Sequence, residues 1–206
     1  MRRGEGQNRD IDRDELRAVD KALRAAGDVR TVLDVGSGNS RWLRHFQALH
    51  PGLVVELDIS QDGLAEARGG VASDQALAGA SSFVCADAGA LPFASQSFDL
   101  VACLQLLPYV RKSGRIRALR EMRRVSSRWV IVEYAHIEGA SFLWQRARRR
   151  LGLEATFPRN HLTMPQVESE LRMVGLGIRG FAPVGGAFSR SWVVLAEAPS
   201  AGWMSS

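Results

Sequence analysis

The sequence predicts an α/β fold in which helices pack on both faces of a mostly parallel β-sheet. The run TVLDV at residues 31–35 has the apolar character of a parallel strand covered on both faces, and it leads directly into a glycine turn and a helix. A second apolar run ends at Asp58, 20 residues beyond Gly38. Strands therefore alternate with predicted helices, over residues 11–26, 41–49 and 61–68.

The glycine turn after the first strand is the expected point of ligand binding. Gly36 and Gly38 allow the backbone to turn sharply and to come close to a ligand. Asp34 is a polar residue inside an apolar run, and a carboxylate is costly to bury without partners. We therefore expect Asp34 to serve a ligand at the carboxyl end of the strand; the alternative is that it caps a helix or forms a turn.

The turn does not match the two common phosphate-binding motifs. A dinucleotide fingerprint Gly-x-Gly-x-x-Gly that begins at Gly36 requires glycine at position 41, where this chain has Arg41. The third glycine of that motif allows close packing above a pyrophosphate, so Arg41 argues against a pyrophosphate here. A P-loop is excluded because no Gly-Lys-Ser/Thr follows the turn.

Two acids at the ends of later apolar runs fit a nucleoside. The Asp58 carboxylate can accept hydrogen bonds from both hydroxyls of a ribose, although this feature alone also fits NAD. Asp87 is followed by Ala88 and Gly89, so it can accept from the exocyclic amine of an adenine. Its alternative role is that of a helix N-cap.

The composition is that of one globular domain. The 206 residues are 46% hydrophobic and 24% charged, and one domain usually has about 100 to 200 residues. We predict a single domain over residues 1–206, with flexible ends at 1–10 and 199–206. No run approaches the roughly 18 apolar residues of a membrane span, and we expect a cytoplasmic protein.

The cysteines and histidines do not form a metal-binding pattern. Cys85 and Cys103 form no Cys-x-x-Cys pair, and both are predicted to be core thiols in neighbouring strands. The histidines are scattered without ligand spacing, so no metal site is predicted from His45, His50, His136 and His161.

The basic charge leaves a nucleic-acid partner open without favouring it. The net charge is +5 with a sequence pI near 10.0, and arginines cluster at Arg146, Arg148, Arg149 and Arg150. However, the chain has 25 Arg against 2 Lys, which indicates the codon bias of a GC-rich genome more than selection for phosphate contacts. Aromatic residues interleaved with basic ones, as in RNA-binding modules, are also missing.

Residues 139–162 are predicted to form an insertion on the substrate side. Within it, residues 141–151 have the pattern of a basic amphipathic helix. Three roles are open for this helix: a lid over the substrate pocket, which we prefer, a solvated structural helix, or a contact with a membrane surface or nucleic acid.

The remainder of the chain completes the predicted sheet. A helix over residues 163–174 begins with a threonine cap and ends at Gly175. Two final strands at 177–183 and 192–197 are expected to pair as an antiparallel edge.

The turn motif VLDVGSGNS resembles motif I of the class I S-adenosylmethionine-dependent methyltransferases, and four further landmarks follow in the order of that family. The runs VVELDIS (54–60) and FVCADA (83–88) are similar to its second and third strands. The segment LPFASQSFDLVAC (91–103) is similar to its lead into the fourth strand. The segments ALREMRRV (118–125) and WVIVEY (129–134) resemble its next helix and fifth strand. Within the family, the resemblance is to quinone and small-molecule methyltransferases.

The resemblance implies a Rossmann-like, seven-stranded, mostly parallel sheet with helices on both faces and an antiparallel last strand. It also implies S-adenosylmethionine as the cofactor, with the glycine loop against the methionine and ribose. It assigns cofactor binding to Asp34, Gly36, Ser37, Gly38, Asp58, Ile59, Asp87 and Ala88, and binding of the methionine amine to the backbone at Cys103, Leu104 and Gln105.

Two positions depart from the family pattern. Ser40 stands where many members have a third glycine, which is expected to stiffen the loop slightly. Ser126, Ser127 and Arg128 replace a Pro-Gly-Gly turn before the fifth strand, and we expect a shorter loop there, remote from the cofactor.

Catalysis of this kind requires alignment more than reactive side chains. Methyl transfer from a sulfonium is an in-line displacement with a good leaving group, so no covalent nucleophile is needed. A hydroxyl or carbon acceptor must lose a proton, and histidine is the natural base. His136 and His161 are the candidate bases, and Tyr109 is a candidate for orienting the acceptor.

The predicted function is methyl transfer to an O, N or C atom of a small molecule. One alternative is an RNA or protein methyltransferase that uses the arginine-rich helix as its contact. Another alternative is a catalytically silent partner protein that has this fold.

Overall fold

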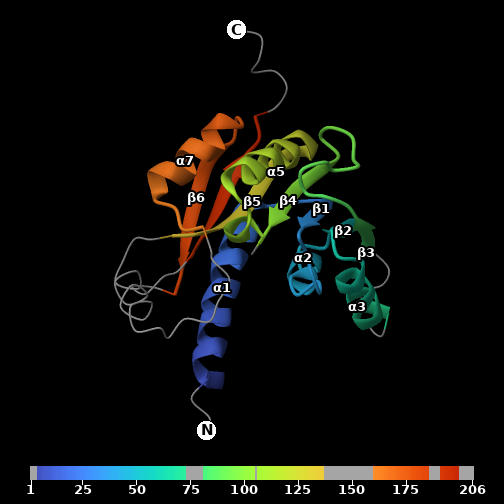
Figure 1. Ribbon diagram of the computed structural model, residues 1–206. Coiled ribbons are helices and arrows are strands. Elements are labelled where there is room, and N and C mark those ends of the chain that lie inside the picture. Colours follow the sequence, from blue (N-terminus) through green and yellow to red (C-terminus); the bar gives the residue numbers. More distant parts are fainter. Residues whose placement is uncertain (1–3, 73–80, 105, 137–159, 186–190, 200–206) are drawn as a thin grey trace.

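The computed structural model describes residues 4–72, 81–104, 106–136, 160–185 and 191–199, with side chains from Arg13 onward. A seven-stranded sheet runs through these residues in the order β3-β2-β1-β4-β5-β7-β6 (Figure 1). The strands are β1 (Thr31–Val35), β2 (Leu53–Asp58), β3 (Ser81–Cys85), β4 (Phe98–Cys103), β5 (Ser126–Ala135), β6 (Gly177–Val184) and β7 (Ser191–Glu197).

The strand directions confirm the predicted architecture. β1 pairs in parallel with β2 and β4, β2 with β3, and β4 with β5. β7 pairs antiparallel with both β5 and β6. The sheet is therefore the expected Rossmann-like one with an antiparallel last strand, and that strand is inserted between β5 and β6.

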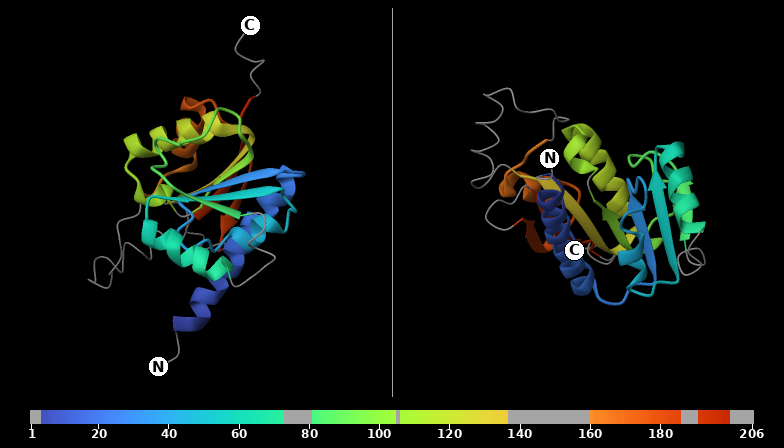
Figure 2. Two further views of the ribbon diagram at one scale, coloured as in Figure 1. Left: turned by 90° about the vertical axis from the view of Figure 1, so that its right-hand side faces the viewer. Right: turned by 90° about the horizontal axis from the view of Figure 1, so that it is seen from below.

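Helices cover both faces of this sheet, and Figure 2 shows α1 and α5 on opposite sides of it. Alternate residues of a strand face opposite layers. In β1, Val32 belongs to the buried cluster that includes residues of α1 and α2, whereas Leu33 and Val35 belong to the cluster on the other face, which includes residues of α5 and α7. The described helices are α1 (Gly4–Ala26), α2 (Leu43–Gln47), α3 (Gln61–Ala72), α5 (Lys112–Val125) and α7 (Met164–Met173), with a short 3-10 helix η1 (Leu107–Tyr109).

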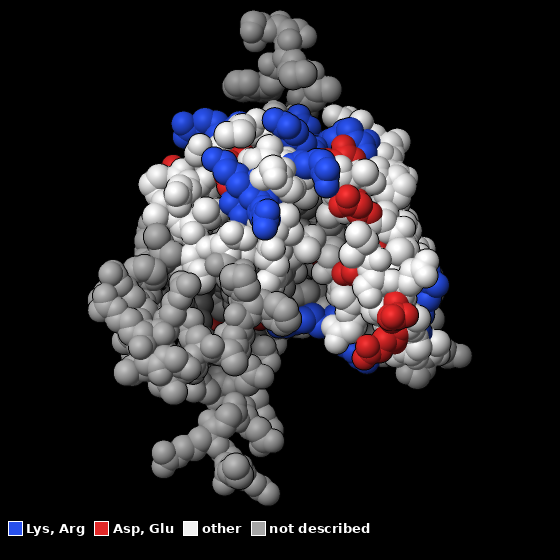
Figure 3. Space-filling view, viewed as in Figure 1, with Lys and Arg blue, Asp and Glu red and all other residues white. Residues whose placement is uncertain are grey.

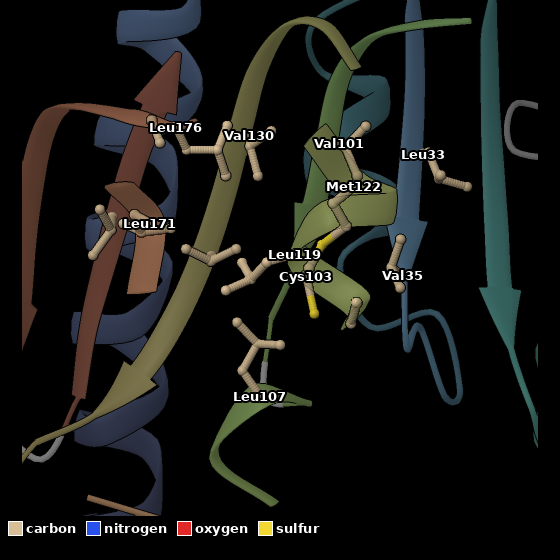
Figure 4. Packing of buried hydrophobic residues seen from close by; sticks show 14 of the residues in the cluster. Leu33, Val35, Val101, Cys103, Leu107, Leu119, Met122, Val130, Leu171 and Leu176 are labelled. Atoms are coloured by element: carbon tan, nitrogen blue, oxygen red, sulfur yellow. The ribbon is translucent and has the colours of Figure 1, made fainter. Parts of the chain in front are cut away.

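The core on the α5 side fixes the two strands that precede the candidate acceptor residues. Leu119 and Met122 of α5 point toward Val101 and Cys103 of β4 and Val130 of β5 (Figure 4). All five side chains are fully buried. Burial of a large apolar side chain stabilises a fold by roughly 1.5–3 kcal/mol, so this contact holds β4 and β5 firmly together.

The helix after the glycine turn is shorter than predicted. The sequence predicts a helix over residues 41–49, but α2 spans only Leu43–Gln47. Ser40 has a φ of 60°, which lies in the left-handed region that a right-handed helix cannot include. The serine that replaces the family's third glycine thus keeps a conformation that glycine adopts more easily.

Two other helices are longer than predicted. α1 begins at Gly4 rather than at residue 11. α3 continues through Gly69 and Gly70 to Ala72, beyond the predicted end at residue 68. Glycine disfavours a helix by about 1 kcal/mol, and the burial of Val71 at the end of α3 offsets this cost.

The prediction that both cysteines are core thiols on neighbouring strands is wrong for Cys85. Cys103 is buried at the end of β4, but Cys85 is exposed at the end of β3. β3 is an edge strand of the described sheet, and β2 and β1 separate it from β4. An edge strand has a neighbour on one side only, which the local sequence pattern does not reveal.

The second departure from the family pattern removes a loop altogether. α5 ends at Val125 and β5 begins at Ser126, so the helix passes directly into the strand. The Ser126 hydroxyl donates to the Trp129 carbonyl at 2.9 Å and accepts from the Arg128 N–H at 3.2 Å. This side chain stabilises the start of β5 in place of a turn.

The SFD segment anchors β4 to the start of β1. Asp99 accepts hydrogen bonds from the N–H groups of Arg30 and Thr31, at 2.8 and 3.1 Å. In return, the Thr31 hydroxyl accepts from the Asp99 N–H at 3.0 Å. This landmark therefore acts at the amino ends of the strands, opposite to the end that carries the glycine turn.

Candidate functional site

The glycine turn is held against the end of β2. The N–H groups of Gly36 and Ser37 both donate to the Leu57 carbonyl, at 2.7 and 3.1 Å. Gly36 has a φ of +78°, and a Cβ atom there would lie 2.9 Å from the Cβ of Leu106. Both the backbone conformation and the close approach therefore require glycine at this position.

Asp58 closes the turn from the other side. Its Oδ2 accepts from the Gly38 N–H and its Oδ1 from the Ser60 N–H, both at 2.9 Å. An ionised carboxylate has about four lone-pair directions, so each oxygen retains capacity to accept from a ligand. Ile59, the next residue, is 73% exposed. An exposed apolar side chain beside a carboxylate fits the base and ribose of a nucleoside.

Asp87 lies at the same edge of the sheet as Asp58. β3 pairs in parallel with β2, and beyond its end the Ala86 N–H donates to the Asp58 carbonyl at 3.1 Å. The Asp87 carboxylate accepts from the Gly89 N–H at 2.8 Å. This is a turn interaction, so Asp87 does not have its alternative role as a helix N-cap. Ala88 between them is half-buried.

The end of β4 adjoins the turn. Asp34 of β1 pairs with Ala102 of β4, and Cys103 and Leu104 follow as buried residues. Burial raises the pKa of the Cys103 thiol far above its ordinary value, so the thiol stays protonated. Gln105, the third residue predicted to bind the methionine amine, lies outside the described residues.

A pair of buried carboxyls lies beneath the turn. Asp34 of β1 and Glu56 of β2 are directly opposite each other in the parallel register, so their side chains share one face. Neither carboxyl has a hydrogen-bond partner among the described residues, and the same holds for the Ser37 hydroxyl and the Trp42 indole N–H. Buried polar atoms are normally paired, so this set indicates a place where bound water or a polar ligand completes the structure.

Burial raises the pKa of both carboxyls. For Glu56 the pKa rises from 4.5 to about 7, mainly through burial, while the nearby hydroxyls of Ser37 and Ser40 oppose the shift. The pKa of Asp34 rises well above its ordinary value, first through burial and then through the negative charges of Glu56 and Asp58. The pair therefore keeps protons at a pH where exposed carboxylates have lost theirs.

Arg41 connects the turn to the first helix. Its Nη2 donates to Glu15 Oε2 of α1 at 2.7 Å, and its guanidinium lies 4.8 Å from the ring centre of Trp42. The residue that breaks the dinucleotide fingerprint thus fixes α1 beside the turn. α2 has only five residues, so it offers no extended helix N-terminus for a pyrophosphate.

The three candidate acceptor-side residues come to one end of the sheet. Tyr109 ends η1 after β4 and is 45% exposed. His136 follows β5 and forms a bridge with Leu162, which brings the neighbouring His161 to the end of the same strand. The N–H of Asn160 donates to the Pro108 carbonyl in η1 at 2.6 Å. Residues 160–162 therefore link the ends of β4 and β5.

The two candidate bases differ in their surroundings. His136 is buried, and its ring stacks on Trp192 with ring centres 4.1 Å apart and an interplanar angle of 4°. His161 is only half-buried. The stacking fixes the ring of His136, whereas His161 is the more accessible of the two.

A buried ion pair supports this end of the sheet. Arg115 of α5 forms two hydrogen bonds with Glu170 of α7, at 2.7 and 3.0 Å, and also donates to the Val110 carbonyl at 2.7 Å. The Tyr134 hydroxyl donates to Glu170 at 3.4 Å, and burial, followed by the Glu170 charge, raises the pKa of Tyr134. Because losing one partner of such a pair is costly, the network holds the segment after η1 in place.

Sequence reasoning missed three residues of this region. Glu56 is a polar residue inside an apolar run, the same signal that singled out Asp34, so it could have been found. Glu15 and Arg117, which contact Arg41 and Asp87, carry no local signal because their partners are 26 and 30 residues away. The predicted insertion at 139–162 lies largely outside the described residues, as does the whole arginine cluster within it.

Two kinds of feature are absent from the described part of the chain. No group of three or more His, Cys, Asp or Glu side chains there is arranged to hold a metal ion. No helix there is long and apolar enough to cross a membrane.

Comparison with known proteins agrees with the fold. Residues 32–128 match the family model of a methyltransferase domain. The structure is similar to magnesium protoporphyrin IX methyltransferase from Synechocystis PCC 6803, solved with bound SAH, with a TM-score of 0.73 and 18% identity over 94% of this chain and 84% of that chain. No curated protein matches the sequence.

Two further solved structures have the same fold. A SAM-dependent methyltransferase from Methanosarcina mazei has a TM-score of 0.70 and 18% identity over 84% of this chain and 93% of that chain. The [4+2]-cyclase SpnF has a TM-score of 0.69 and 18% identity over 88% of this chain and 81% of that chain.

The sheet order, the antiparallel last strand and the glycine turn after β1 define the class I methyltransferase fold. The methyltransferase-domain match covers residues 32–128, just under half of the chain, and the structures of similar fold include one methyltransferase solved both with bound SAH and with bound SAM. The resemblance and the cofactor predicted from the sequence are thereby confirmed. The roles of the individual site residues stay predictions.

The buried carboxyl pair predicts a pH-dependent stability. Between about pH 4.5 and 7, the unfolded chain loses the Glu56 proton that the folded chain keeps, so the free energy of unfolding falls as the pH rises. A shift of this size corresponds to roughly 3 kcal/mol. Glu56→Gln, which does not titrate, should be more stable than the wild type at pH 8 and should differ less at pH 5, as measured by urea unfolding.

The matched control is Glu66→Gln on the exposed side of α3, which should leave the pH dependence of unfolding unchanged. If Glu56→Gln and the wild type lose the same stability between pH 5 and pH 8, Glu56 does not keep its proton in the folded chain.

Proposed function

We propose that this chain binds S-adenosylmethionine at the carboxyl ends of β1 to β4 and transfers its methyl group to an O, N or C atom of a small-molecule acceptor. The observation that carries the proposal is the grouping of Asp58, exposed Ile59 and Asp87 beside the glycine turn. This combination offers acceptors for ribose hydroxyls, an apolar contact for a base and an acceptor for its amine.

The residues of the site divide the work of binding. Asp58 accepts from the ribose hydroxyls, Ile59 covers the adenine, and Asp87 with Ala88 meets its edge. Asp34 and the backbone of the turn lie toward the methionine part, whose amine is held by the backbone at 103–105. These assignments are supported by the placement of each residue at one edge of the sheet.

The chain supplies alignment rather than a covalent nucleophile. When bound, S-adenosylmethionine supplies a methyl group on a sulfonium with a good leaving group. His161 is proposed to take a proton from the acceptor, His136 to line the pocket from its stacked position on Trp192, and Tyr109 to orient the acceptor. The half-buried environment of His161 suits exchange of a proton with a ligand.

A small acceptor is favoured by the similar fold of a methyltransferase that acts on magnesium protoporphyrin IX. An RNA or protein acceptor, contacted by the arginine cluster at 146–150, is the second candidate, and a steep loss of affinity with salt would mark the nucleic-acid form. A third candidate is that this chain has the fold but does not transfer methyl groups. The similar fold of a [4+2]-cyclase supports this candidate. A cytoplasmic location stays a prediction.

The cofactor site predicts a large effect of Asp58→Ala. This variant removes the acceptors for both ribose hydroxyls and releases the Gly38 N–H from its partner, and two hydrogen bonds to a charged group are together worth a loss of about a hundredfold or more in affinity. Calorimetric titration with S-adenosylmethionine should show this loss. The control Asp62→Ala, which removes an exposed acid of α3, should bind as the wild type does. If Asp58→Ala binds S-adenosylmethionine as tightly as the wild type, the proposed cofactor site is wrong.

The acceptor side predicts a separate effect on turnover. His161→Ala should lower the acceptor-dependent release of S-adenosylhomocysteine about a hundredfold or more, as expected for loss of a general base, without weakening cofactor binding. The assay uses a panel of phenols, quinols and carboxylic acids, and His136→Ala and Tyr109→Phe are measured beside it. Wild-type turnover in both histidine variants would exclude histidine base catalysis.

A further inference from the structure

One side chain of α5 reaches the loop that carries Asp87. Arg117 Nη2 donates to Asp87 Oδ2 at 3.4 Å, across 30 residues of sequence. Figure 3 shows that Lys and Arg side chains gather on the upper part of this face, over α5. Arg117 differs from the exposed arginine one turn later, Arg120, in having this contact with a residue of the proposed adenine site.

Gly89 provides room for this contact. A Cβ atom at Gly89 would lie 2.3 Å from Nε and 3.1 Å from Cζ of Arg117, so the guanidinium lies against the backbone of the loop. The φ of Gly89 is not in the left-handed region that favours glycine. A larger residue at this position would therefore displace the guanidinium, with no penalty from the backbone conformation.

The Asp87 carboxylate is held from two sides. Its Oδ1 accepts from the Gly89 N–H at 2.8 Å, and its Oδ2 accepts from Arg117. These contacts use about two of its four lone-pair directions and leave the others toward the exposed edge. The side chain of Asp87 is 53% exposed, so its orientation depends on these two contacts and not on packing.

The contact contributes little to folding. The Arg117 side chain is 66% exposed, and ion pairs between exposed side chains contribute about 1 kcal/mol at most. The same contact can still matter for ligand binding. A site binds its ligand most tightly when its side chains are already held in the orientation that the ligand requires.

We propose that Arg117 is a positioning residue for the adenine end of the cofactor site. It holds the Asp87 carboxylate so that a remaining lone pair accepts from the adenine amine, and it lies over Gly89 to do so. The proposal rests on the proposed role of Asp87 as the acceptor for that amine.

The test compares two ligands that differ only at the position that Asp87 is proposed to contact. S-adenosylhomocysteine has an amine there, and its 6-deamino analogue, in which purine replaces adenine, has a hydrogen atom. Arg117→Gln should weaken binding of S-adenosylhomocysteine about three- to tenfold and change binding of the 6-deamino analogue less than about twofold, so that the difference in affinity between the two ligands becomes smaller. Arg120→Gln, the matched control, should leave both dissociation constants and the melting temperature unchanged.

Gly89→Ala gives an independent way to displace the guanidinium. It should reproduce the effect of Arg117→Gln, and the double variant should bind no worse than either single variant, because both remove the same contact. Additive losses in this cycle would overturn the proposal, as would equal weakening of both ligands with a lower melting temperature in Arg117→Gln.

Asp87→Ala tests the proposed role of Asp87 separately from the proposed role of Arg117. If Asp87→Ala loses affinity for S-adenosylhomocysteine and Arg117→Gln does not, Arg117 is not a positioning residue and the cofactor site stands. If Asp87→Ala keeps wild-type affinity, the assignment of Asp87 itself fails, and the role of Arg117 fails with it.

Discussion

The hydrogen bonds between the glycine turn and the end of β2 hold the candidate site together. The Leu57 carbonyl accepts from two N–H groups of the turn, and the Asp58 carboxylate accepts from a third, that of Gly38. These bonds fix the turn where it passes Leu106, which lies between β4 and η1. Asp58 is therefore both part of the structure and part of the proposed site, since one carboxylate shapes the turn and offers its remaining lone pairs to a ligand.

The same region carries the least favourable features of the fold. Asp34 and Glu56 are buried opposite each other without partners, and Ser40 has a left-handed backbone conformation. Each feature costs free energy that a purely structural sheet would avoid. Features that destabilise a fold locally are expected where a protein binds a ligand or catalyses a reaction. Here all of these features lie beneath or beside one turn. The core between α5, β4 and β5, by contrast, consists of well-packed apolar side chains.

The sequence was sufficient to predict the strands and the edge of the sheet at which the site lies. The first parallel strands are largely apolar runs: Asp34 is a polar residue inside the first, Asp58 ends the second and Asp87 lies just beyond the third, so their positions follow from local pattern. The length of α2 did not follow from local pattern: the structure has a helix only over Leu43–Gln47. The exposure of Cys85 depends on β3 being an edge strand, which is a property of strand order.

Contacts between residues far apart in the sequence also could not be predicted from local sequence patterns. Arg117 reaches Asp87 because α5 packs beside the loop after β3, and Arg41 reaches Glu15 because α1 lies beside the turn. Sequence spacing gives no sign of either pair. Glu56 is different, because a glutamate within the run VVELDIS was visible as a polar intrusion, and its register with Asp34 makes it part of the site region.

The central claim is that the turn and the acids after β2 and β3 form the binding site for S-adenosylmethionine. A crystal structure of the protein with S-adenosylhomocysteine tests it most directly. We expect the ribose hydroxyls within hydrogen-bonding distance of the Asp58 carboxylate and the adenine amine within hydrogen-bonding distance of Asp87, with Ile59 against the base. A ligand bound elsewhere, or one whose ribose and adenine contact neither acid, would contradict the account.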